Sequence, residues 1–327
     1  MKKHLLSVVA LILALTPAAF AKHDAMSLIP NDVVSVGVVR LADMRNSPLS
    51  SALFQQTAHV SMDDDAVKFL RDAGLQPTRD VDVVVFTTSP RTSLGGEADI
   101  LIAADGRFNV ERLSSALESR GATRKSSANG SYLLIPHSDN GHDRGPMAVA
   151  FPDSHLAVLG SEGAVVEALT SRAAGGTAFT TTSGLGRDLS RIDPHATAWV
   201  LVDVARAKRL TGAPHMSDHN SSAQVIGSAL KSMSTVAMWA TDAGDSLKLS
   251  AIGLSRDTET LGLLEDTIRG ALSALRLAVQ DKSPELVSVL RKFSVSRGDD
   301  SVTISGTVSG DTFRTWVARS SSSHSTR

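Results

Sequence analysis

The fold of this chain is decided by the stretch Ile29-Pro30-Asn31-Asp32-Val33-Val34-Ser35-Val36-Gly37-Val38-Val39. Its proline, asparagine and aspartate favour a turn, and the β-branched run that follows predicts a buried strand over residues 33–39. A comparable stretch, Ile192-Asp193-Pro194-His195 with the apolar run 196–202 after it, begins the second half of the chain. The sequence therefore predicts two halves that start alike, over residues 28–180 and 190–318.

The order of the later elements also favours an internal duplication. The predicted hairpin and helix of residues 81–119 correspond to residues 236–277, and the strand and helix of 156–171 correspond to 302–318. The order strand–helix–strand–strand–helix–strand is that of the split βαβ arrangement in ferredoxin-like domains. The predicted fold class is therefore α+β, with two related ferredoxin-like halves whose mainly antiparallel sheets carry packed helices.

The predicted strands are apolar at nearly every position. Val81, Val83, Val84, Val85 and Phe86 show no alternation of apolar with polar residues. A strand with this pattern is buried on both faces, so we expect the second face of each sheet to be covered, for instance by the partner half. The best-determined helix spans residues 258–280, because its apolar residues recur three or four positions apart and form one stripe.

The N-terminal segment has the order of a cleavable secretory signal peptide. The basic start Met1-Lys2-Lys3-His4 precedes the apolar run 5–15 and the small residues before Ala21. The apolar run is too short to span a bilayer, which takes about 20 residues. The prediction is a signal peptide over residues 1–21, cleaved after Ala21, with a periplasmic or secreted mature chain and no later transmembrane segment. Residues 22–28 are expected to be a short disordered lead, and the Ser-rich tail 319–327 to be disordered.

Composition excludes several classes of function. The chain has no cysteine, so it holds neither disulfides nor thiolate metal sites. Its formal net charge is −1 and its aromatic content 4%, which disfavours both neutralisation of phosphates and stacking on bases. The sequence predicts no nucleic-acid partner and no cofactor. It leaves another envelope protein or an apolar ligand as the expected partner.

The chain resembles a family of exported bacterial proteins of unknown function with duplicated α+β halves. The resemblance is carried by the start Leu28-Ile29-Pro30-Asn31-Asp32 before a valine strand, by Phe151-Pro152-Asp153 before Leu156-Ala157-Val158-Leu159-Gly160, and by the repeated hairpin and helix. It extends over most of residues 28–318, and no single motif in it is specific. The resemblance implies an envelope α+β protein and supplies no catalytic residues.

Two loops gather histidine and aspartate and are the candidate metal ligands. They contain His137, His142, His215 and His219. Imidazole and carboxylate groups suit zinc, copper or nickel, although polar loops also collect these residues for turn formation. A metal site would require the fold to bring the two loops together.

Motifs of catalysis are incomplete. Ser228-Ala229-Leu230-Lys231 and Ser138-Asp139-Asn140 match two pieces of the serine penicillin-recognising enzymes, but their order is reversed and Lys-Thr-Gly is absent. Asp43 and Asp203 each follow the first strand of a half, and could pair with Arg45 and Arg206. We interpret these carboxylates as helix caps, with a polar site as the alternative.

The prediction is a non-enzymatic exported envelope protein that acts as a binding or interaction module. The alternatives are a periplasmic hydrolase and a carrier of an apolar ligand. A pocket gathering Asp43, Asp203 and their arginines would favour the hydrolase. A lined apolar cavity would favour the carrier, and one apolar surface patch the interaction module.

Overall fold

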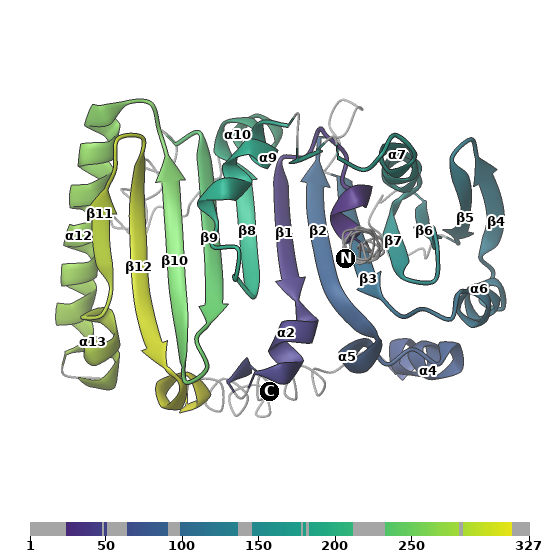
Figure 1. Cartoon of the computed structure of the whole chain (residues 1–327), viewed down its shortest axis with the longest axis horizontal. Coiled ribbons are helices and arrows are strands. Elements are labelled where there is room, and N and C mark those ends of the chain that lie inside the picture. Colours follow the sequence, from purple (N-terminus) through teal and green to yellow (C-terminus); the bar gives the residue numbers. More distant parts are fainter. Residues whose placement is uncertain are drawn as a thin grey trace, which may run out of the picture.

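A single antiparallel sheet runs across the molecule. The computed structural model describes residues 24–47, 49–50, 64–90, 99–136, 146–177, 179–180, 183–211, 233–280 and 284–315. Within this part, 12 strands lie in the order β11-β12-β10-β9-β8-β1-β2-β3-β7-β6-β5-β4 (Figure 1). They are β1 (Ser35–Arg40), β2 (Val81–Ser89), β3 (Asp99–Gly106), β4 (Thr123–Ser127), β5 (Gly130–Ile135), β6 (Met147–Ala150), β7 (Leu156–Ser161), β8 (Ala198–Asp203), β9 (Thr235–Asp242), β10 (Ser246–Leu254), β11 (Ser294–Arg297) and β12 (Ser301–Ser309).

Helices lie between these strands along the chain. They are η1 (Ala25–Leu28), α2 (Leu41–Asn46), α4 (Asp64–Ala73), α5 (Pro77–Asp80), α6 (Val110–Glu118), α7 (Glu162–Ala173), α9 (Gly184–Asp188), η2 (Leu189–Arg191), α10 (Val204–Thr211), α12 (Thr258–Val279) and α13 (Pro284–Leu290). Within the described residues, none of these helices is long and apolar enough to cross a bilayer.

The local sequence signals predict most of these elements correctly. The strand expected at 33–39 is β1, and the hairpins expected at 81–104 and 236–253 are β2–β3 and β9–β10. The helix expected at 258–280 is α12. The side chain of Asn109 accepts from the Arg112 amide at 3.0 Å and so caps α6, as its position predicts. β4 was not predicted, because its sequence TRKSS carries no apolar pattern.

The two halves join edge to edge and do not stack. β1 pairs with β8 antiparallel, with Val38 opposite Trp199, so one sheet continues through both halves. The expectation that one half covers the face of the other is therefore wrong. Ladder hydrogen bonds between the first strands of the halves satisfy the backbone of both edges.

The strand pairing also differs from the split βαβ prediction. A βαβ unit needs two parallel strands, whereas each neighbouring pair of described strands is antiparallel. β1, β2 and β3 form a meander, in which β1 pairs with β2 and β2 pairs with β3. The coarser prediction is confirmed: the protein is a mixed helical and strand fold built on a large antiparallel sheet.

One face of the sheet, termed the core face, carries the main hydrophobic core. The strand residues Val36, Val85, Val158 and Leu201 are at most 1% exposed and pack there beneath η1, α7 and α9. Leu28 of η1 is fully buried in the same cluster. The prediction of a disordered lead over residues 22–28 is thus wrong for Ala25–Leu28, because this short apolar segment inserts between α7 and the sheet.

Candidate functional site

A row of apolar residues crosses the sheet on the face opposite the core. In antiparallel sheets, residues opposite each other in register point to the same face. The registers link one residue of each of seven neighbouring strands, from β3 to β12. The row reads Ile102, Phe86, Gly37, Val200, Met238, Ala251 and Ile304. It crosses the seam at which β1 and β8 join the two halves, so neither half contains it alone.

Three large residues of this row are exposed, unlike those of the core face. Met238 is 52% exposed, Phe86 39% and Ile102 38%, although all three are large and apolar. Ile100, two residues before Ile102 and so on the same face, is 53% exposed. Single exposed apolar residues are common, but a contiguous group of them marks a binding surface.

Helices cover the two ends of this face. At one end, Leu264 of α12 packs with Val236 and Val302 of the sheet. At the other end, Phe108 and Leu113 pack over Val84 and Ala104. No helix of the described residues covers the row between them. We call this exposed middle, from Ile102 to Ile304, the apolar trough.

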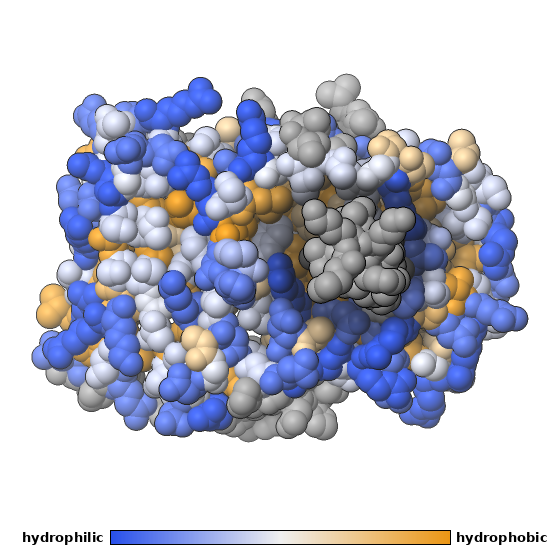
Figure 2. Space-filling view, viewed as in Figure 1, coloured by the Kyte–Doolittle hydropathy of each residue, from blue (hydrophilic) through white to orange (hydrophobic). Residues whose placement is uncertain are grey.

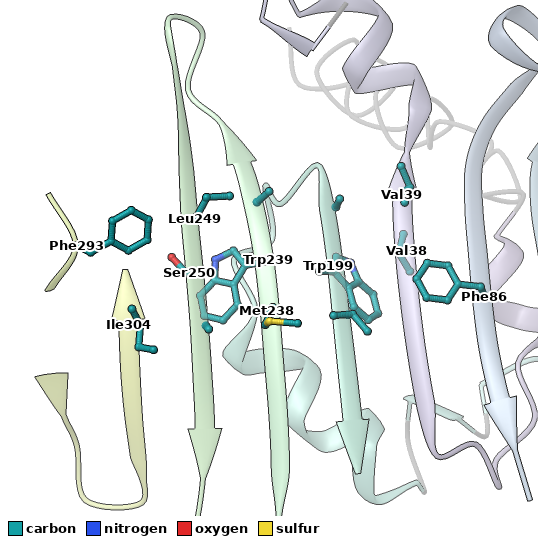
Figure 3. Close-up of a pocket in the computed structure, with 14 residues that line it drawn as sticks. Val38, Val39, Phe86, Trp199, Met238, Trp239, Leu249, Ser250, Phe293 and Ile304 are labelled. Atoms are coloured by element: carbon teal, nitrogen blue, oxygen red, sulfur yellow. The ribbon is translucent and has the colours of Figure 1, made fainter. Parts of the chain in front are cut away.

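The trough contains a hollow of about 470 Å³ over strands β1, β8, β9, β10 and β12. Phe86 and Phe293 stand at its two sides, and Met238 lies between them (Figure 3). Its described lining contains no charged side chain, and Ser250, which also lines it, belongs to the register row of the core face. The hollow is within the 300–1,000 Å³ range that is usual for small-molecule sites.

A second hollow of about 310 Å³ continues the first beneath α12. Ala251 and Ile304 line both hollows. Leu264, Ile268, Leu272 and Leu275 of α12 form its outer wall, and its described lining contains no polar side chain. The apolar stripe predicted for α12 therefore has two roles. The N-terminal part of the stripe belongs to the core, where Leu261 and Leu264 are at most 3% exposed. The C-terminal part of the stripe forms a wall of the open hollow.

The core face over the same strands has a different character. Ser250, Ser305 and Ser294 form a cross-strand row there. Figure 2, which views this side, shows many neutral and hydrophilic residues over β10 to β12, with hydrophobic patches between them. The apolar surface is therefore specific to the trough and not a general property of the second half.

The candidate metal ligands His137, His142, His215 and His219 lie outside the described residues. The same holds for Ser138-Asp139-Asn140 and for Ser228 and Lys231. Within the described ranges, no group of three or more histidine, aspartate and glutamate side chains is arranged to hold a metal ion.

The aspartates that follow the first strand of each half do not form one site. Because β1 and β8 are antiparallel, Asp43 and Asp203 lie toward opposite ends of the strands. Asp203 Oδ1 accepts from the Arg206 amide at 2.8 Å, which is a helix cap. The Arg206 side chain instead pairs with Asp32.

Arg45 has a comparable structural role in the first half. It pairs with Asp82 and donates to the Val81 carbonyl oxygen at 2.8 Å. Both arginines therefore tie a helix that follows a first strand to a neighbouring segment. The cap interpretation holds for Asp203, whereas Asp43 lies in the first turn of α2, whose N-cap has no side-chain hydrogen bond.

A polar cleft of about 800 Å³ lies beside α9 and the start of α12. Its carboxylates are largely engaged: Asp300 pairs with Arg191, and Asp257 caps α12 by accepting from the Glu259 amide at 3.0 Å. Asp203 is among its lining residues, whereas Asp43 and Arg45 are not. The cleft thus lacks the constellation that would favour a hydrolase.

Sequence reasoning missed the trough residues. The apolar strands were recognised, but their second face was expected to be covered. Phe86, Met238 and Ile304 have the same local pattern as buried strand residues, because periodicity reports which faces are apolar and not what covers them.

Comparison with known proteins gives likeness to solved structures alone. No family model matches the chain, and no curated protein matches it. Crystal form III of TP0453 aligns with a TM-score of 0.49 at 9% identity, covering 90% of this chain and 98% of that one. Crystal form I of TP0453 aligns with a TM-score of 0.48 at 10% identity, covering 92% of this chain and 98% of that one.

Proposed function

We propose that this chain is an exported, non-enzymatic binding protein that holds an apolar partner in the trough. The observation that carries the proposal is the apolar row over seven adjacent strands, in which Met238, Phe86 and Ile102 are exposed, with two connected hollows along it. Exposed apolar surface costs free energy in water, about 25 cal/mol per Å², which a bound apolar partner would recover. The proposal includes release from the cytoplasm through the signal peptide predicted for residues 1–21, with the bacterial envelope as the site of this activity.

The proposal includes a duplicated origin for the two halves and membership of the family of exported proteins that the sequence resembles. Support for duplication comes from the strand order. Counted outward from the seam, the strands of the first half are β1, β2, β3 and β7, and those of the second half are β8, β9, β10 and β12. The helix after each hairpin, α6 or α12, packs on the trough side of the sheet. In this interpretation the trough arose where the two copies joined.

The binding proposal is tested with an uncharged apolar fluorophore, N-phenyl-1-naphthylamine, titrated into the mature chain. We expect saturable binding with increased emission. Met238→Asp should weaken that binding by about tenfold or more, because it brings a charge into an apolar contact surface. The matched control is Leu277→Asp, at a helix residue that is 71% exposed and lines neither hollow.

Two outcomes would contradict the binding proposal. One is an absence of saturable probe binding to the wild-type chain. The other is an equal loss of binding in both variants, with both still folded by circular dichroism. Export is tested separately, by sequencing the N-terminus of protein from the envelope fraction: Lys22 is the expected first residue, and a chain that starts at Met1 in the cytosol would contradict it.

A further inference from the structure

The trough selects for a ligand without a peptide backbone. β8, β9, β10 and β12 are interior strands, so their backbone groups already bond to neighbouring strands. A peptide laid across them would lose water from its N–H and C=O groups and gain no partners, at a cost of about 1–3 kcal/mol for each group. An unbranched hydrocarbon chain has no such groups. Its flexibility also lets it follow both hollows past Ala251 and Ile304, which line each of them.

Two basic residues directly precede one wall of the trough in the sequence. Phe293 forms the wall there and lies against the sheet at Gly306, where a Cβ atom would come within 2.5 Å of its ring. Arg291 and Lys292 directly precede Phe293, and both are exposed. No carboxylate side chain is among the described residues that line either hollow.

A third basic residue, Arg276, holds the turn that contains Arg291 and Lys292. Arg276 of α12 donates to the Leu290 carbonyl oxygen at 2.8 Å and to the Phe293 carbonyl oxygen at 3.3 Å. This arginine is therefore committed to the backbone of the turn. Arg291 and Lys292 line neither hollow, but both are exposed and stand directly before the Phe293 wall in the sequence.

We propose that the occupant of the trough is a long-chain fatty acid, with its alkyl chain along the apolar row and its carboxylate beside Arg291 and Lys292. The inference rests on the proposed function, and adds to it the class of ligand and its direction. Apolar contact supplies most of the affinity, while the two exposed cations favour a negatively charged head group.

The test measures displacement of N-phenyl-1-naphthylamine by three ligands of equal chain length: hexadecanoate, hexadecanol and hexadecyltrimethylammonium. The expected order of affinity is carboxylate, alcohol, ammonium, with the carboxylate favoured over the alcohol by about threefold to tenfold at low salt. This range is what two exposed ion pairs typically contribute. The preference should decrease as salt screens the charges.

The variant Arg291→Gln/Lys292→Gln should reduce the preference for carboxylate over alcohol to about one and leave the alcohol affinity unchanged. The matched control is Arg124→Gln/Lys125→Gln, which removes an adjacent arginine and lysine from β4 at the other edge of the sheet. That control should keep the wild-type preference.

Equal affinity of the wild-type chain for carboxylate and alcohol would overturn the head-group assignment, and so would a preference that persists in Arg291→Gln/Lys292→Gln. In either case the apolar trough would still bind the alcohol, so the proposed function would stand. Failure of every ligand and of the fluorophore to bind would contradict the proposed function itself.

Discussion

Phe86 lies directly over Gly37 at the seam between the two halves. A Cβ atom at Gly37 would come within 2.0 Å of the Phe86 ring, closer than any real contact of this kind. The two residues face each other in register on β1 and β2. The missing side chain at position 37 is thus what allows an aromatic ring to lie flat on the sheet and form one side of the hollow.

Gly37→Ala is therefore expected to displace the Phe86 ring and to lower the free energy of unfolding by about 1–3 kcal/mol, as other overpacked sites do. Phe86→Ala in the same chain removes the clash. The loss in the double variant should then be smaller than the sum of the two single losses. Urea unfolding of the four chains measures this coupling. Additive losses would show that ring and glycine do not interact.

Thr87 is a buried polar residue whose hydroxyl oxygen has no hydrogen-bond partner among the described residues. Thr87 is 1% exposed and lies on the core face, opposite Val36 in register. Thr87→Val keeps the shape and removes the unsatisfied group, so we expect the free energy of unfolding to rise by about 1 kcal/mol. Urea unfolding is the measurement.

The neighbouring residue provides the control for that change. The hydroxyls of Thr88 and Ser35 are 2.7 Å apart and share a hydrogen bond. Thr88→Val breaks this bond and should leave the chain no more stable than the wild type. A stabilisation of equal size in both variants would assign the effect to strand propensity rather than to the buried hydroxyl.

Leu28 lies inside the core, because η1 packs against α7 and the sheet. Leu28→Ala should lower the free energy of unfolding by about 2–5 kcal/mol, as the loss of a fully buried leucine side chain does. Leu277→Ala, at the 71% exposed position on α12, should change it by less than about 0.5 kcal/mol. Similar small changes in both would mean that the N-terminal segment does not contribute to the core.

Asp242 links the end of β9 to residues near α2 by accepting hydrogen bonds from Ser47 and Ser50, the latter at 2.7 Å. Burial alone would raise the pKa of this carboxyl, but the hydrogen bonds from Ser47, Ser50 and the Gly244 amide outweigh it and lower the pKa below its ordinary value. A lowered pKa in the folded state gives stability that is present above the unfolded pKa and is lost as pH falls through the folded pKa.

Asp242→Asn is thus expected to lower the free energy of unfolding at pH 7 by about 1–2 kcal/mol, as the loss of charge-assisted hydrogen bonds does. The difference from the wild type should shrink as the pH is lowered through the ordinary aspartate range and below it. Urea unfolding over a pH series checks this. Asp245→Asn, in the same hairpin and exposed, serves as control. A difference from wild type that is constant with pH would exclude the carboxylate as its origin.

Much of the local structure follows from the sequence because its causes are local. β-branched runs specify β1 and β2, and Asn109 and Ser161 cap α6 and α7 from their own side chains. The apolar stripe of α12 likewise follows from helical geometry. The polar residues of β4 carry no apolar pattern that would predict a strand, although β4 pairs with β5 in a hairpin across Ala128 and Asn129.

The sequence predicts the apolar strands β1 and β2, the hairpins β2–β3 and β9–β10, and the helix α12. Only the tertiary structure decided that the halves join through β1 and β8 into one sheet, and that Phe86 and Met238 stay exposed while Val85 is buried. The physical reason is that hydrophobicity has no direction: it drives apolar faces out of water but does not specify which segment covers them. Which segment covers a given face depends on contacts between residues far apart in the chain. In this protein those contacts cover the core face and leave the trough open.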